Sequence, residues 1–99
     1  MKITLSPEVE EYLHHKHKEV LEVFVEKIYS THMMEPVSHL EIKYGAPHSN
    51  IRDKFKTFDI DGFKVYIEDD LLDETTDVMF HLEKFLGLKY IEVDGLKRH

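Results

Sequence analysis

Residues 57–67 read Thr-Phe-Asp-Ile-Asp-Gly-Phe-Lys-Val-Tyr-Ile, and this stretch decides the fold. Apolar and polar residues alternate on both sides of Asp61-Gly62, and such a pair strongly favours a two-residue hairpin turn. The pattern predicts a β-hairpin with one apolar face, formed by Phe58, Ile60, Phe63, Val65 and Ile67. An isolated hairpin is only marginally stable in water, so further strands or a helix must cover that face.

The composition limits the classes of function. The chain has 99 residues, 41% hydrophobic and 33% charged, which is typical of a single globular domain spanning residues 1–99. Its formal net charge of −7 repels phosphate backbones and anionic lipid, so we expect neither nucleic acid nor membrane as a partner. No apolar run approaches the roughly 20 residues of a membrane span, and the first residues lack the apolar core of a signal peptide. We therefore expect a cytoplasmic protein.

Cysteine is absent from the chain. Disulfides, thiolate-bound zinc, thiol nucleophiles and cysteine-held iron–sulfur clusters are therefore excluded for the chain acting alone. Eight histidines are present, and imidazole binds zinc, nickel and copper. We expect no cofactor, with a divalent transition metal held by histidine as the alternative.

Local signals place one helix near the start of the chain. Residues 2–5 alternate as a short strand, and Ser6-Pro7-Glu8 then supplies an N-cap hydroxyl, a proline at the first helical position and an early acid. The helix is predicted to begin at Pro7 and to end near Lys18. Residues 20–29 fit either a strand or a continued helical stripe, and their β-branched residues and alternation with charge favour the strand.

Further strands are predicted at residues 38–44, 78–82 and 88–93, because apolar and polar residues alternate there. Residues 30–36 read as a loop closed by a proline, and Phe85-Leu86-Gly87 reads as a turn. About seven short strands and one N-terminal helix, joined by short connections, predict an α+β fold with a mostly antiparallel, twisted sheet.

Two histidine constellations are candidates for chemistry. If the helix continues to Lys18, His14 and His17 lie three residues apart on one face and could share a metal ion. The alternative is a cationic cluster that the helix dipole favours at a C-terminus. His81 next to Glu83 could transfer a proton, but a histidine on the outer face of a strand is commoner. No nucleophilic triad or phosphate loop can be assigned, so we expect no enzyme.

A binding role is the remaining class. Tyr29, Tyr66 and Tyr90, together with the Met33-Met34 loop, could form an aromatic patch for a protein partner, since such residues are enriched at interfaces. Edge strands would also allow pairing into a homodimer. The alternative is that these tyrosines fill the second face of a strongly curved sheet.

The order of these elements and several short sequences resemble the HesB-like, A-type iron–sulfur carrier family. The nearest pattern is its short prokaryotic branch, whose members carry a cysteine-cysteine or cysteine-selenocysteine motif. The sequences that carry the resemblance are Ile-Thr-Leu-Ser-Pro-Glu at 3–8, Glu-Pro at 35–36, Tyr-Gly-Ala-Pro at 44–47, the hairpin at 58–67 and the closing stretch 85–95. The resemblance implies a HesB-like fold.

The same resemblance locates where the family chemistry would lie. The paired cysteines of that family fall just before the Glu-Pro, where this chain has Thr31-His32-Met33-Met34, and its C-terminal cysteines are also missing here. The resemblance therefore implies a non-ligating homologue of an iron–sulfur cluster biosynthesis protein, acting as an accessory or protein-interaction module. The alternative is a histidine-based metal-binding protein with His32, or His14 and His17, as ligands.

Overall fold

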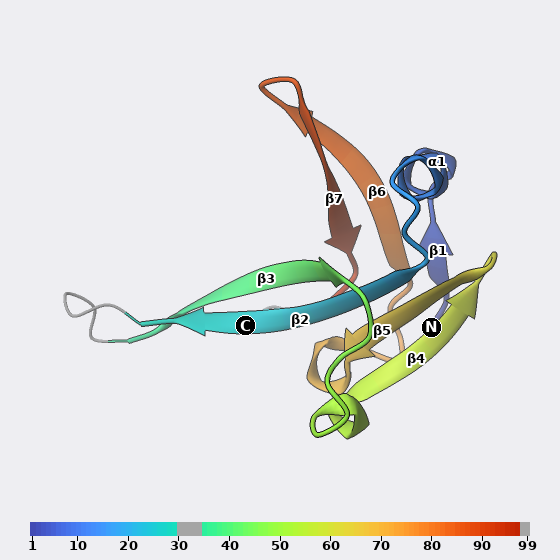
Figure 1. Cartoon of the computed structure of the whole chain (residues 1–99). Helices are drawn as coiled ribbons and strands as arrows, with labels where there is room; N and C mark the ends of the chain where they lie inside the picture. The colour runs from blue at the N-terminus through green and yellow to red at the C-terminus, as the bar shows by residue number, and fades with distance from the viewer. Residues whose placement is uncertain (30–34, 98–99) are drawn as a thin grey trace.

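Two sheets, one α-helix and two short 3-10 helices, Arg52–Lys54 and Asp69–Leu71, make up the structure in Figure 1, a computed structural model that describes residues 1–29 and 35–97. Within these residues the first sheet has the strand order β1-β6-β7 and the second has the order β3-β2-β5-β4. The strands are β1 (Ile3–Leu5), β2 (Val20–Ile28), β3 (Val37–Tyr44), β4 (Phe55–Ile60), β5 (Phe63–Glu68), β6 (Val78–Phe85) and β7 (Leu88–Asp94), and the helix is α1 (Pro7–His15). The predicted α+β class, with an N-terminal helix and seven strands, is confirmed, and the strands divide between two sheets.

The predicted hairpin is the β4–β5 pair. Ile60 pairs with Phe63 across Asp61 and Gly62, which have φ angles of 51° and 89°. Positive φ at both central residues is the type I′ turn, whose twist matches that of the strands it joins. Side chains on one face of β5 are buried in the core, as the alternation predicts.

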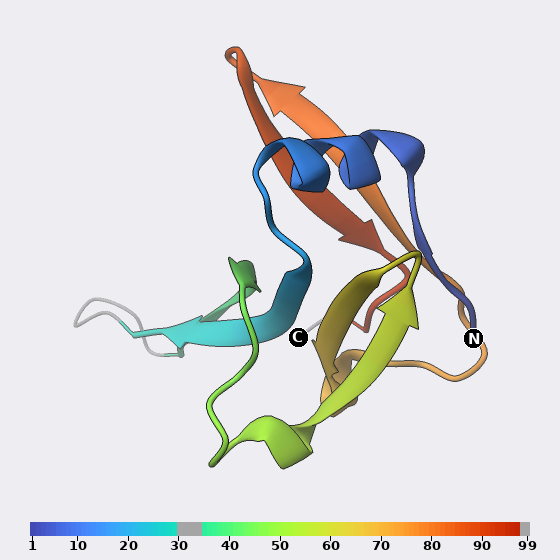
Figure 2. The ribbon, with the colours of Figure 1, turned by 45° about the vertical axis from the view of Figure 1, so that its right-hand side comes forward.

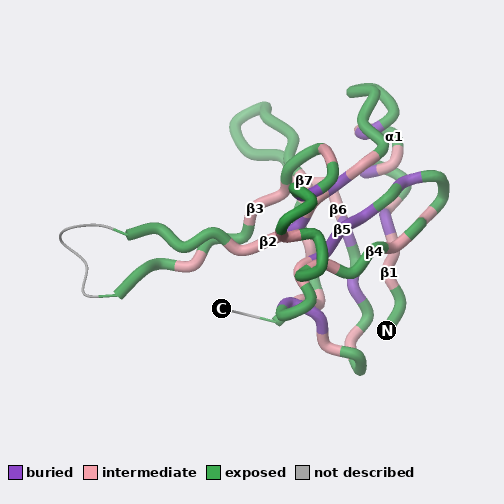
Figure 3. Tube along the Cα trace, turned by 60° about the horizontal axis from the view of Figure 1, so that its bottom comes forward, coloured by how far each residue is buried: buried purple, intermediate pink, exposed green. Residues whose placement is uncertain are grey.

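The ambiguous stretch after the helix is a strand. β2 lies inside the second sheet, parallel to β5 on one side and antiparallel to β3 on the other. Leu21 and Val23 are fully buried, whereas the far ends of β2 and β3 extend beyond the core and are exposed (Figure 3). The strand interpretation of residues 20–29 is therefore confirmed.

The helix begins as predicted and ends earlier than predicted. Ser6 Oγ accepts a hydrogen bond from the backbone N–H of Val9 at 3.2 Å, and Pro7 is the first helical residue. The last helical residue is His15, because His17 takes a left-handed conformation with φ of 57°. The N–H groups of His17 and Lys18 then donate to the carbonyls of His14 and Leu13, which is the pairing of a Schellman cap. The predicted end near Lys18 was wrong.

One hydrophobic core joins the two sheets and the helix. Figure 2 shows α1 lying across β6 and β7, with β4 and β5 on the other side of the core. The buried core residues are Leu5, Val9, Leu13, Leu21, Val23, Phe63, Val65, Ile67, Leu71, Leu72, Val78 and Phe80. In the described ranges, no helix combines the length and the apolar character needed to cross a lipid bilayer.

Candidate functional site

The core face of the second sheet continues past the part that the first sheet covers. Leu40 and Ile42 on β3 pair with Val25 and Val23 on β2, so they share the face that packs into the core. Val23 is fully buried, yet Leu40 remains 38% exposed. The apolar face of β3 is therefore only partly covered by the rest of the protein.

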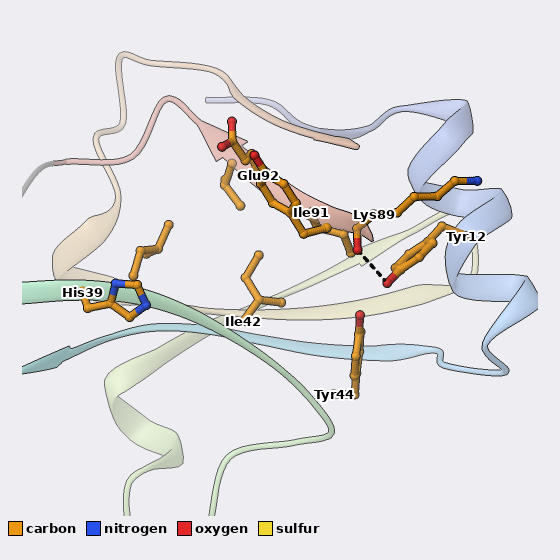
Figure 4. Close-up of a pocket in the computed structure, with 10 residues that line it drawn as sticks. Tyr12, His39, Ile42, Tyr44, Lys89, Ile91 and Glu92 are labelled. Atoms are coloured by element: carbon orange, nitrogen blue, oxygen red, sulfur yellow. Dashed lines mark hydrogen bonds between the residues drawn. The ribbon is translucent and has the colours of Figure 1, made fainter. Parts of the chain in front are cut away.

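A cleft lies over this uncovered face. It has a volume of about 560 Å³, and Leu40, Ile42 and Tyr44 of β3 form one wall. Residues 89–93 of β7 form the other wall, and in Figure 4 Ile42 and Ile91 lie on these facing walls. Both β3 and β7 are edge strands of their sheets, so the cleft runs between two edges that have free backbone groups.

The end of the cleft next to the helix is aromatic and flanked by cations. Tyr12 of α1 donates its hydroxyl hydrogen to the carbonyl of Lys89 at 3.3 Å, and the hydroxyls of Tyr12 and Tyr44 point toward one another (Figure 4). Two effects raise the pKa of Tyr44 above its ordinary value. The larger is partial burial, and the smaller is the neighbouring Tyr12. Lys16 Nζ lies 5.0 Å from the centre of the Tyr12 ring, and Lys18 Nζ lies 5.9 Å from that of Tyr44.

The predicted tyrosine patch is only partly present. Tyr90 lines the cleft and Tyr29 is 74% exposed near the far end of β2. Tyr66 was wrongly assigned to the patch, because it is 8% exposed and packs inside the protein. Met33 and Met34 lie outside the described residues.

The predicted helical histidine pair does not have the predicted geometry. His14 is on the last turn of α1, with its ring centre 5.0 Å from that of Phe63, whereas His17 follows the helix end. The shared helical face that the prediction required is absent. Metal binding by His14 and His17 stays a prediction, and His32 lies outside the described residues.

His81 has more partners than the sequence indicated. Its Nδ1 lies 3.0 Å from Glu83 Oε1, as the predicted pair requires. Its Nε2 lies 2.9 Å from Asp94 Oδ2 and 3.8 Å from Glu92 Oε2, both on β7. Across residues 1–29 and 35–97, His81, Glu83 and Glu92 are the single group of three histidine or carboxylate side chains whose ligand atoms lie within 4.8 Å of one another.

Sequence reasoning missed most of the cleft. The predicted helix contains Tyr12, and the predicted strand at residues 38–44 contains Leu40, Ile42 and Tyr44, but nothing in the sequence brings the two elements together. The alternation of β3 does place these three side chains on one face. It carries no signal for how far a second sheet covers that face.

Comparison with protein families gives a match over nearly the whole chain. The model of the CC/Se motif containing family matches residues 1–96. Among curated proteins, none matches this chain. The family description refers to a cysteine or selenocysteine motif, and this chain contains no cysteine. Since the match covers nearly all of its 99 residues, the chain belongs to the CC/Se motif containing family.

Proposed function

We propose that this chain is a HesB-like accessory protein of cytoplasmic iron–sulfur cluster biosynthesis that holds no cluster itself. Its role is to bind an extended segment of a protein partner in the cleft between β3 and β7. The observation that carries this proposal is an apolar cleft of about 560 Å³ between two edge strands. Most residues that line the cleft are tyrosine or aliphatic, with His39, Lys89 and Glu92 beside them, and this lining supports a binding role.

The backbone of β3 supports an extended ligand. An edge strand presents one row of free N–H and C=O groups, and a partner segment that adds as a strand satisfies them. Side chains of that segment would then enter the cleft beside Leu40 and Ile42, where they continue the core face of the sheet. Burial of apolar surface favours such binding by about 25 cal/mol per Å² before the cost of association and of ordering the segment is subtracted.

The charges around the cleft specify the partner segment further. Lys16, Lys18 and Lys89 lie at the end formed by Tyr12 and Tyr44. The chain as a whole carries −7, so this cationic end differs in sign from the average surface. We therefore expect an apolar segment with an acidic residue that lies next to α1.

The absence of cysteine supports the accessory role. The family description names a CC/Se motif, which we read as cysteine or selenocysteine. Such residues would hold a cluster or react with a thiol. This chain has no cysteine, so it has no thiolate to do either. What the chain retains is the match to the family model across residues 1–96. An interaction surface needs no thiolate.

The test is selection of peptides from a displayed random library, followed by affinity measurement with purified protein. Leu40→Glu places a charge in the wall of the cleft and should weaken binding of a selected peptide at least tenfold. Val37→Glu is the matched control on the same strand, because Val37 is 48% exposed and does not line the cleft. It should change the affinity less than twofold.

Two results would overturn the proposal. One is a selected peptide that binds Leu40→Glu as tightly as the unchanged protein. The other is a concentration-dependent dimer in sedimentation that Leu40→Glu dissociates, since the cleft would then hold a second copy of this chain.

A further inference from the structure

The outer face of the β6–β7 hairpin carries a polar cluster centred on one histidine. Inward-facing residues of this hairpin, such as Val78 and Phe80, are buried in the core. The alternate residues His81 and Glu83 face the other way, and His81 pairs directly with Glu92 across the two strands. Asp94 is two residues further along β7, on the same face. Four side chains with nitrogen or oxygen ligand atoms therefore meet at one place on a paired hairpin.

The imidazole of His81 is oriented with one nitrogen left unsatisfied. Nδ1 is 3.0 Å from Glu83 Oε1, and in the tautomer that carries its proton on Nδ1 this N–H donates to the carboxylate and the lone pair is on Nε2. Nε2 is buried and has no hydrogen-bond partner among the described residues, although Asp94 Oδ2 lies 2.9 Å away. Metal-bound histidines usually have this arrangement, in which a carboxylate accepts from one ring nitrogen and the other nitrogen binds the ion.

The spacing of the ligand atoms fits a metal ion. Two ligand atoms that each lie about 2.1 Å from an ion are roughly 3.0 Å apart at a right angle and roughly 3.4 Å apart in a tetrahedron. Nε2 of His81 lies 3.8 Å from Glu92 Oε2, between these separations and the roughly 4.2 Å of two opposite ligands. Asp94 Oδ2 is nearer to Nε2, at 2.9 Å, but Asp94 does not belong to the group of ligand atoms that lie within 4.8 Å of one another.

The local charge also favours a cation. The carboxylates of Glu83, Glu92 and Asp94 lie 3.0, 3.8 and 2.9 Å from an imidazole nitrogen of His81, so three negative charges surround one imidazole. Lys84 and Lys89 pair with each other on the opposite face of the hairpin.

We propose that the outer face of the β6–β7 hairpin binds one divalent first-row transition-metal ion through His81 and Glu92, with Glu83 as the positioning residue for the imidazole. One imidazole and one carboxylate are a mixed ligand set that suits Mn²⁺, Fe²⁺ or Zn²⁺, and they leave positions for water or a ligand from a partner. The site adjoins the cleft, because Glu92 belongs to the wall formed by residues 89–93, but metal binding there does not require the partner segment.

The probe is Mn²⁺, because its preference for oxygen ligands keeps it from surface histidine clusters such as residues 14–17. Titration followed by electron paramagnetic resonance of free Mn²⁺ should give about one bound ion per chain. His81→Gln and Glu92→Gln should each weaken binding at least tenfold, and Glu83→Gln should weaken it roughly 10–100-fold, the effect expected for an orienting partner. Circular dichroism checks that each variant folds.

The matched control is His39→Gln, since His39 pairs with Glu41 at 3.1 Å in the same histidine-x-glutamate spacing on β3 and is in no such three-residue group. It should bind Mn²⁺ within twofold of the unchanged protein. Paramagnetic broadening in NMR spectra should centre on residues 79–94. No saturable binding, unchanged affinity in His81→Gln, or broadening confined to residues 14–17, which means an adventitious ion only, would overturn the proposal.

Discussion

At the scale of single residues, Asp73 organises the connection between the two sheets. Its Oδ1 accepts from the backbone N–H of Thr75 at 3.0 Å and from the Thr75 hydroxyl at 2.8 Å. Its carbonyl accepts from the N–H of Thr76 at 3.1 Å. The hydrogen bonds from Thr75 hold the pKa of this carboxyl below its ordinary value of 3.8. The one from the Thr75 backbone has the larger effect, and the one from the Thr75 hydroxyl comes second. The ionised form of Asp73 therefore stabilises this turn before β6.

Asp73→Ala should lower the midpoint of urea unfolding at neutral pH. A lowered pKa in the folded state stabilises the protein above the ordinary value of 3.8, and this contribution is lost as the pH falls through the folded-state pKa. The difference in urea midpoint between the variant and the unchanged protein should therefore become smaller in acid. Urea unfolding curves recorded at several pH values measure this difference. Glu74→Ala is the control on the neighbouring exposed carboxylate. A gap that keeps its full size at pH about 2 would contradict this assignment.

At the scale of elements, the residues of the β4–β5 turn made that hairpin predictable from the sequence. Asp61-Gly62 supports positive φ at two positions, which defines the register of β4 and β5. The helix end was predicted wrongly because His17 occupies the left-handed position where glycine is the usual signal. Helical periodicity alone shows no stop at that residue.

The candidate sites differ in how far the sequence could reach them. A two-residue turn at Leu86-Gly87 pairs Phe85 with Leu88, and counting four residues back and forward pairs His81 with Glu92. The pairing of His81 with Glu92 could therefore be predicted from the sequence by counting from the turn. The cleft could not be predicted in this way. Its depth depends on where the first sheet ends over β3, and local sequence patterns do not encode how distant strands pair.

Gly95, just beyond β7, should be far more sensitive to substitution than Gly87 in the β6–β7 turn. Both have positive φ, 96° and 80°, but a Cβ at Gly95 would collide with the carbonyl oxygen of Asp77, whereas one at Gly87 meets open space. Gly87→Ala should cost about 1–2 kcal/mol of the free energy of unfolding. Gly95→Ala should cost roughly 1–3 kcal/mol more. Chemical denaturation of both variants measures the difference, and equal losses would contradict the close approach.

At the scale of the whole molecule, one core unites the two sheets. Phe80 from β6 and Phe63 from β5 are 0% and 2% exposed and belong to the same buried cluster. Strand β1 lies at the edge of the first sheet, and the N–H of Val78 donates to the carbonyl of Lys2 at 2.7 Å. Neither sheet buries its apolar face without the other, so we expect one cooperative unit.

Phe80→Ala should lower the free energy of unfolding by about 3–5 kcal/mol, because it leaves a cavity where the two sheets meet. Unfolding monitored by far-ultraviolet circular dichroism and by tyrosine fluorescence should still give coincident transitions, since the chain has five tyrosines and no tryptophan. Two separated transitions would show that the sheets unfold independently.

The parallel pairing of β1 with β6 also orders events during protein synthesis. Ile3 pairs with Val78, and Lys2 donates to Asp77 across 75 residues of chain. At about 5–20 residues per second, ribosomes need roughly 4–15 s to make the intervening stretch. During that interval β1 and α1 have emerged without the strand that completes their packing. The apolar side chains of the N-terminal segment therefore stay without their final packing partners until β6 has been made.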